Sequence, residues 1–274
     1  MGRGHSMSDH FIIAGFHRSA TSMVAQLLHR AGLFLGDELL GASPSNPYGH
    51  YEDREVIRLH GDILADNGLS WQVDSPLLPV INQTRWQALQ RFIERRNIRH
   101  KLWGFKDPRV CLFMMVWKYL LPQAKVLIVY RHFSDVTYSL SRRQSSDIFQ
   151  KKGPQHLHRR FWQEPDLALR MWLVHTKALL AFARTYPEDT LVVSQDMVYG
   201  NFPLIRAINN RWGFGLEEIP SNEVLDLTVT ERRPGRQPLS DSRLIEHLEA
   251  TWQTLELLSA NTTRTFKELN DGVQ

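Results

Sequence analysis

The sequence predicts an α/β fold: one domain built on a central parallel sheet with helices on both faces. Short apolar runs alternate at least four times with segments of helical periodicity. One run, residues 125–130 (KVLIVY), is almost continuously apolar, as strands buried on both faces of a sheet are. No internal repeat or break in composition divides the chain, so we expect a single domain over residues 7–274. We interpret the six residues before Met7 as a cloning remnant.

Four short apolar runs predict the strands of this sheet. Each ends at a glycine, a charged residue or another polar residue, where a loop would begin. The runs are residues 11–14 (FIIA), 102–105 (LWGF), 125–130 (KVLIVY) and 190–194 (TLVVS).

Apolar residues three or four positions apart predict helices between the strands. We expect Thr84 to cap one helix, Pro122 to stop the next and Gly213 to follow the last as its C′ residue. The predicted helices are residues 22–33, 52–69, 84–99, 109–121, 134–143, 165–186 and 197–212. The turn formers GASPSNPYG make residues 36–49 a loop, and the basic segment 144–164 has the composition of a second loop.

The amino-acid composition excludes several classes of protein. Of 274 residues, 42% are hydrophobic and 23% charged, which excludes disorder, collagen-like repeats and coiled coil for the chain as a whole. A single cysteine, Cys111, cannot form an internal disulfide, so we expect a reducing, cytoplasmic location. No apolar stretch reaches the roughly 20 residues of a membrane span. A net charge of +4 is too small to predict a nucleic-acid partner, but it suits a small anionic ligand.

The segment GFHRSATS, from Gly15 to Ser22, joins the first strand to the first helix. Backbone N–H groups and a helix N-terminus meet at such a turn, so it predicts an anion site. Compared with the phosphate-binding pattern GxxxxGK[ST], it has Ala20 for the second glycine and Thr21 for the lysine, and Arg18 supplies a cation instead. An ordinary strand-to-helix turn uses the same residue types, so that alternative stays open for this loop alone.

Two further residues point to the same edge of the sheet. Arg131 follows the most apolar strand, and Ser139 lies eight positions later within the next predicted helix. Both can converge on one anion. Taken singly, an arginine at a strand end is more often a surface ion pair, and a helical serine more often has no special role.

Four segments in this order resemble the PAPS-dependent sulfotransferases, in particular their bacterial branch. They are FHRSATS, NPYGHYEDREVIRLHGDIL, WGFKDPRVCLF and LPQAKVLIVYRHFSDVTYSLSRR. The resemblance covers roughly residues 11–194 and implies a P-loop nucleoside-triphosphate-hydrolase-like fold. It also implies a sulfotransferase that moves the sulfuryl group from PAPS to a hydroxyl or amine of a small-molecule or glycan acceptor. The product of the donor would be 3′,5′-adenosine bisphosphate.

The resemblance assigns roles to individual residues. It implies that the loop binds the 5′-phosphosulfate, that Arg131 and Ser139 bind the 3′-phosphate, and that Arg18 is catalytic, because it falls where the cytosolic branch has its catalytic lysine. The expected donor-binding residues are His17, Arg18, Ser19, Ala20, Thr21, Ser22, Arg131, Ser139, Arg232 and Arg233. PAPS is expected as co-substrate, with no metal ion.

The chain departs from the cytosolic branch at three places. Ala20 replaces a glycine, which predicts an ordinary backbone conformation there because alanine disfavours positive φ. Met23 replaces an adenine-stacking tryptophan. Lys106-Asp107-Pro108 replaces Lys-Thr-His, so the catalytic histidine of that branch is missing; Asp107 could instead form a structural pair with Arg109.

Glu52 is the candidate general base for the acceptor. It follows the GASPSNPYGHY loop, and a carboxylate can take a hydroxyl proton from about 3 Å away. The alternative, that Glu52 and Asp53 simply favour a helix N-terminus, is equally open. His50, His60 and His17 are weaker candidates.

Two other functions stay open. A P-loop kinase of a small metabolite would need a lysine beside Ser22 and a magnesium-binding acid after an apolar strand, and the sequence offers neither. A basic binding module without catalysis is suggested by residues 91–101 and 142–160. Segment 142–160 is either a solvated loop or a lid that attracts the anionic donor.

Overall fold

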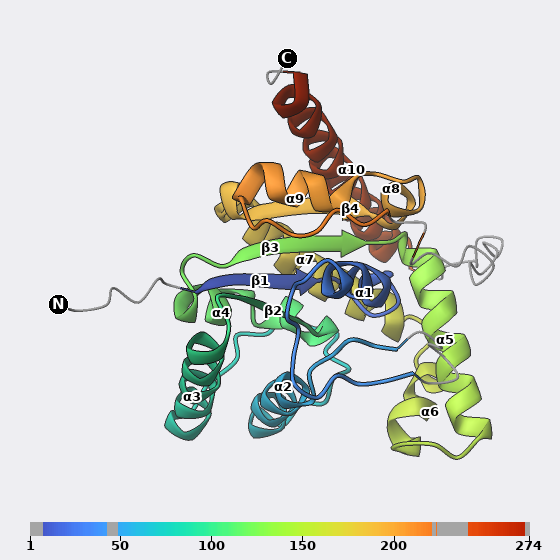
Figure 1. Ribbon diagram of the computed structural model, residues 1–274. Helices are drawn as coiled ribbons and strands as arrows, with labels where there is room; N and C mark the ends of the chain where they lie inside the picture. Colours follow the sequence, from blue (N-terminus) through green and yellow to red (C-terminus); the bar gives the residue numbers. More distant parts are fainter. Residues whose placement is uncertain (1–7, 43–48, 221–222, 224–240, 272–274) are drawn as a thin grey trace.

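Four parallel strands form the centre of the protein in the computed structural model (Figure 1), which describes residues 8–42, 49–220, 223 and 241–271. The strands are β1 (Asp9–Ala14), β2 (Leu102–Lys106), β3 (Lys125–Tyr130) and β4 (Thr190–Ser194), in the order β2-β1-β3-β4. Every neighbouring pair is parallel. The predicted α/β class and all four predicted strands are therefore confirmed.

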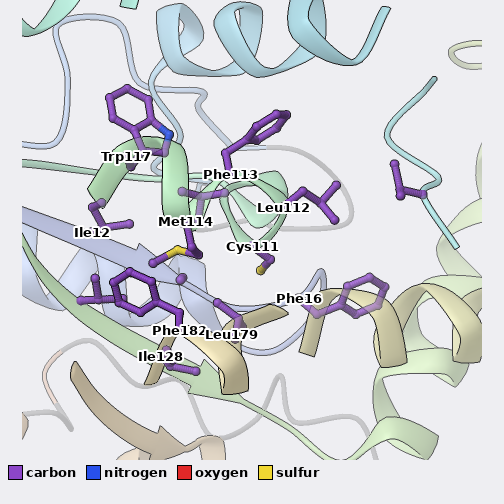
Figure 2. Packing of buried hydrophobic residues seen from close by; sticks show 14 of the residues in the cluster. Ile12, Phe16, Cys111, Leu112, Phe113, Met114, Trp117, Ile128, Leu179 and Phe182 are labelled. Atoms are coloured by element: carbon purple, nitrogen blue, oxygen red, sulfur yellow. The ribbon is translucent and has the colours of Figure 1, made fainter. Parts of the chain in front are cut away.

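Each face of the sheet carries its own apolar core, because alternate strand residues point to opposite faces. Ile12 and Ile128 belong to one core, and Ile13 and Val129 belong to the other. Figure 2 shows the first core, to which Ile12, Ile128 and Cys111 belong. Burial raises the pKa of the Cys111 thiol to about 12, so this cysteine is a core residue and not a nucleophile.

Helices cover both faces. The first core packs against α2 (Arg54–Asp66), α3 (Gln83–Arg99), α4 (Met114–Leu120) and α7 (Leu167–Thr185). The second packs against α1 (Thr21–Arg30), α8 (Gln195–Tyr199) and α9 (Leu204–Trp212). The remaining helices are α5 (Phe133–Phe149), α6 (Gln155–Gln163) and α10 (Ser242–Asp271), with short 3-10 helices at Pro108–Leu112 and Pro187–Asp189.

The predicted loop at 144–164 is wrong. Helix α5 continues to Phe149, and α6 runs back beside it to form a helical hairpin (Figure 1). Gln144, His158 and Phe161 are buried, while Lys151, Lys152 and Arg159 are exposed. The basic composition concealed the apolar stripe of α6 because that stripe is short.

Local hydrogen bonding shifted other predicted boundaries. Asn82, not Thr84, caps α3, because the Asn82 side chain accepts a hydrogen bond from the backbone N–H of Arg85. The segment 109–121 divides into the 3-10 helix and α4, and 197–212 divides into α8 and α9 before Pro203, which has no N–H to continue a helix. Gly213 ends α9 at a φ of 69°, as expected for a C′ glycine.

Helix α10 was not predicted, and it covers the edge strand β4. The Tyr130 hydroxyl lies 2.7 Å from the Ser259 hydroxyl and donates to Glu256 at 2.8 Å. The backbone N–H of Val192 in β4 donates to the Thr262 hydroxyl at 3.3 Å. A covered edge cannot pair with the strand of another molecule.

We expect Gly104→Ala to lower the free energy of unfolding by about 1 to 3 kcal/mol, the usual cost of overpacking. A Cβ on Gly104 would lie 2.2 Å from the carbonyl oxygen of Phe11, so β2 would have to move away from β1. Urea unfolding followed by circular dichroism measures the change.

Gly61→Ala is the matched control. Gly61 lies within α2, and its added Cβ would meet only the Arg109 guanidinium at 3.8 Å. Alanine should therefore stabilise the helix by roughly 0.5 to 1 kcal/mol. Equal stability of Gly104→Ala and the wild type would contradict the close approach of the two strands.

Candidate active site

The loop between β1 and α1 begins very close to the backbone of the neighbouring strand, β3. A Cβ on Gly15 would lie 2.3 Å from the carbonyl oxygen of Val129 in β3, so only glycine fits there. Arg18 and Ala20 both have a φ of 65°, in the left-handed region. The prediction of an ordinary conformation at Ala20 is wrong: Ala20 is the N-cap of α1 and has a left-handed backbone, and its carbonyl accepts hydrogen bonds from Met23 and Val24.

Two non-glycine residues in the left-handed region carry a conformational cost of order 1 kcal/mol or more each. Such a loop persists only where its surroundings determine its conformation, and strain of this kind is common at binding and catalytic sites. The role of the loop as an anion site, as against a plain strand-to-helix turn, stays a prediction.

Two cations tie the loop to other elements. Arg18 Nε donates to the Ser139 hydroxyl of α5 at 2.9 Å. Lys106 Nζ, at the carboxyl end of β2, donates to the Ser22 hydroxyl at 3.1 Å. The same ammonium group donates to the His50 carbonyl at 3.0 Å and to Glu52 Oε1 at 2.6 Å. The loop, α5, β2 and the segment before α2 thus meet around two positive charges.

Sequence reasoning did not select Lys106. Only 2% of its surface is exposed, although lysine is rarely buried without a partner. A signal was present: Lys106 ends an apolar run, and the carboxyl ends of parallel strands meet at the edge where ligands bind.

Arg131 follows β3 directly, so it lies at the same edge as the loop after β1. Its Nε is buried and donates no hydrogen bond among the described residues; the Asp135 carboxylate is 3.6 Å away. Ser139 is 2% exposed and bonds to Arg18 rather than to Arg131. Joint binding of a 3′-phosphate by Arg131 and Ser139 stays a prediction. Arg232 and Arg233 lie outside the described residues.

Glu52 and Asp53 have different roles. Helix α2 begins at Arg54, two residues later than predicted, and Asp53 is its N-cap: the Asp53 carboxylate accepts from the Glu55 N–H and pairs with Arg96. Glu52 lies before the cap and faces Lys106. The alternative, that these carboxylates favour a helix N-terminus, therefore explains Asp53. It does not explain Glu52, which belongs to the cation cluster.

His60 is a structural residue. It is fully buried, with Nδ1 2.8 Å from Asp107 Oδ2 and Nε2 accepting from Trp117 Nε1 at 2.8 Å. Arg109 Nε donates to Asp107 Oδ1 at 2.9 Å, as the structural-pair alternative expected. Burial opposes ionisation of Asp107, but Arg109 and His60 outweigh it and hold the Asp107 pKa well below its usual range. With both ring nitrogens engaged, His60 cannot be the base.

His17 and His50 are neutral histidines beside the cations of the site. Burial, then the charges of Lys106, Arg143 and Arg18, lower the pKa of His50 to about 4. Burial, chiefly, holds the pKa of His17 well below its ordinary value. The centroids of the His17 and Trp71 rings are 5.0 Å apart. Both imidazoles are neutral at pH 7, chiefly because they are buried, and the same cations that add to the shift at His50 attract an anion.

Comparisons with known proteins are limited. No family model and no curated protein matches the sequence. Among solved structures, a sulfotransferase from Mycobacterium tuberculosis H37Rv aligns with 95% of this chain and 76% of that one, with 12% identity and a TM-score of 0.42. A likeness this distant does not establish a shared activity, so the functional assignment depends on the site itself.

The described residues contain neither a metal-ligand cluster nor a membrane-spanning helix. No three His, Cys, Asp or Glu side chains gather there as ligands for a metal ion. No helix in that part of the chain is long and apolar enough to cross a membrane.

We expect stability to fall as the pH drops from about 6.5 to 4, and His175 to be one cause. Burial lowers its folded-state pKa to about 4, so between these values the unfolded chain binds a proton that the folded one does not. Each such group costs up to about 1.4 kcal/mol per pH unit. Urea unfolding at several pH values should show that the free energy of unfolding of His175→Leu falls less steeply with decreasing pH than that of the wild type. Parallel slopes for His175→Leu and wild type would contradict a buried neutral imidazole.

Proposed function

We propose that the protein is a sulfotransferase that uses PAPS as donor. The observation that carries the proposal is the cation cluster around the loop: Arg18 bound to Ser139 on one side and Lys106 bound to Ser22 on the other, with Arg131 at the end of the next strand. PAPS carries negative charge at two separated places, and the cluster offers cations at separate elements of one sheet edge.

An anionic donor would supply hydrogen-bond partners to two buried polar groups of the site. Arg131 Nε and the Ser19 hydroxyl are both buried and, within the described part of the chain, make no hydrogen bond. Leaving such a group unsatisfied costs roughly 1 to 3 kcal/mol, which an anionic oxygen would remove. We assign the 5′-phosphosulfate to the loop and the N-terminus of α1, and the 3′-phosphate to Arg131 and Ser139.

The transfer would proceed in line. The acceptor oxygen forms a bond to sulfur while the bond from sulfur to the 5′-phosphate oxygen breaks, and that oxygen keeps the electron pair. Arg18 and Lys106 stabilise the charge that develops on it; one well-placed donor is commonly worth about a hundredfold in rate. The acceptor proton passes to Glu52, whose carboxylate lies 2.6 Å from Lys106 Nζ and is thereby oriented toward the same place.

Ser22 argues against the kinase alternative. In P-loop kinases the corresponding hydroxyl binds magnesium. Here the Ser22 hydroxyl accepts a hydrogen bond from Lys106 Nζ, so a cation of the protein itself stands where that metal would bind.

Thermal unfolding with two isomeric nucleotides tests the donor assignment. The product 3′,5′-adenosine bisphosphate at a hundred times its Kd should stabilise the protein by about 2.7 kcal/mol, or roughly 5 °C. ADP has the same number of phosphates, but both are at the 5′ position, so it lacks the 3′-phosphate and should stabilise the protein less. A larger gain from ATP with magnesium would favour the kinase.

Arg131→Ala should weaken binding of the bisphosphate by about ten- to a hundredfold, because it removes a charge-assisted contact worth about 1.5 to 3 kcal/mol. Its effect on ADP should be smaller. Calorimetry measures both, with Arg184→Ala, an exposed arginine of α7, as the matched control. Unchanged affinity of Arg131→Ala for the bisphosphate would contradict the assignment.

Glu52→Gln should lower kcat for transfer to an aliphatic alcohol by about a hundredfold or more, since the amide cannot accept a proton. The loss should be smaller for p-nitrophenol, which ionises without help. Release of bisphosphate from PAPS measures both reactions, and His50→Gln is the companion variant. Equal losses with the two acceptors would instead make Glu52 a residue that positions Lys106.

A further inference from the structure

The α5–α6 hairpin presents an exposed aromatic pair. Phe149, the last residue of α5, is 78% exposed, and Trp162 of α6 is 54% exposed. Their ring centroids are 6.1 Å apart. Large apolar side chains that adjoin each other in water are unusual on a protein surface and commonly mark a site of interaction. Among the described residues, no ring contact or hydrogen bond joins this pair to the candidate active site.

Unpaired cations accompany the aromatic rings. Lys151, Lys152 and Arg159 are exposed and have no ion-pair partner among the described residues. Lys151 and Lys152 follow Phe149 in the turn, and Arg159 lies three residues before Trp162, one helical turn away.

The acidic side chains of the hairpin are already engaged. Asp147 lies 3.7 Å from Arg143, and Glu164 is bound by both Arg160 and Arg170. The surface around Phe149 and Trp162 is therefore positive, with its carboxylates neutralised.

The surface is preformed on a rigid support. Trp162 Nε1 donates to the Ser145 hydroxyl at 2.9 Å, and buried His158 bonds to Gln144, so α6 is fixed to α5. Buried Phe161 stacks on Trp71 and attaches the hairpin to the rest of the protein. The hairpin projects beyond the sheet (Figure 1), so its outer surface can approach a flat partner.

We propose that this surface, formed by Phe149, Lys151, Lys152, Arg159 and Trp162, binds an anionic lipid bilayer. Aromatic rings beside lysine and arginine suit the interface, where rings enter the headgroup region and cations meet lipid phosphates. A second copy of the chain is the less favoured partner, because a two-fold contact would set this positive surface against itself. The proposal does not depend on the sulfotransferase assignment.

Co-sedimentation of the full chain with vesicles tests the proposal. Binding is expected with phosphatidylcholine vesicles that contain phosphatidylglycerol, and should be weak with phosphatidylcholine alone. It should fall as salt is raised, since salt screens charges at the surface. Absence of binding to the anionic vesicles at low salt would overturn the proposal.

Two variants separate the contributions of charge and apolar surface. Replacing Lys151, Lys152 and Arg159 with serine should weaken partitioning roughly a hundredfold, at about fivefold for each charge. Phe149→Ser with Trp162→Ser should also weaken partitioning. Brominated lipid should quench the fluorescence of Trp162 in the wild type, and this part of the quenching should be lost in the double variant. Circular dichroism checks that each variant is folded.

Matched controls remove equal groups elsewhere. Serine at Arg91, Lys101 and Arg184 removes three exposed charges, and Ile98→Ser removes an exposed apolar residue of α3. Both should bind like the wild type. If the charge control loses as much binding as the hairpin variant, the attraction is general and the proposal fails. A dimer in analytical ultracentrifugation that Phe149→Ser with Trp162→Ser dissociates would identify a second copy as the partner instead.

Discussion

The buried ammonium group of Lys106 is the interaction on which the site depends. Removing a lysine charge from water is costly unless oxygen atoms replace the water. Here three oxygens do so, from Ser22 on the loop, the His50 backbone and the Glu52 carboxylate. These oxygens come from two separate parts of the chain, and Lys106 itself ends β2, so satisfying one charge also positions the loop, the segment before α2 and the end of β2 relative to one another.

Asp107, the residue after Lys106, fixes the position of the carboxyl end of β2. Asp107 is buried and ion-paired with Arg109, accepts a hydrogen bond from the neutral ring of His60, and caps the 3-10 helix that follows β2. Trp117 in turn donates to His60 and fixes its tautomer. A buried carboxylate with all its partners present makes the carboxyl end of β2 rigid, and a rigid end is what an ammonium group needs to act at a defined distance.

The same cations also contribute to the electrostatic potential at the neighbouring histidine, His50. Lys106, Arg143 and Arg18 act together with burial on His50, so its imidazole stays neutral at pH 7. The left-handed backbone at Arg18 and Ala20 is sustained in part by the bond from Arg18 to Ser139, which joins the loop to α5. The loop conformation, the cation positions and the neutral histidines are thus parts of one arrangement, and the hairpin that extends from α5 is attached to it.

The sequence by itself determined the α/β class, the four strands and the edge at which the loop and Arg131 lie, because strand periodicity and continuous apolar runs are local properties. Only the tertiary structure decided which side chains meet there. Glu52 turned toward Lys106 and Asp53 toward the helix, although the two are adjacent and chemically alike. His60 became structural because Asp107 and Trp117 come from distant elements. Pairings across 50 or more residues, such as those of Lys106 with Glu52 and His60 with Trp117, are set by packing of the whole domain, and no local pattern encodes them.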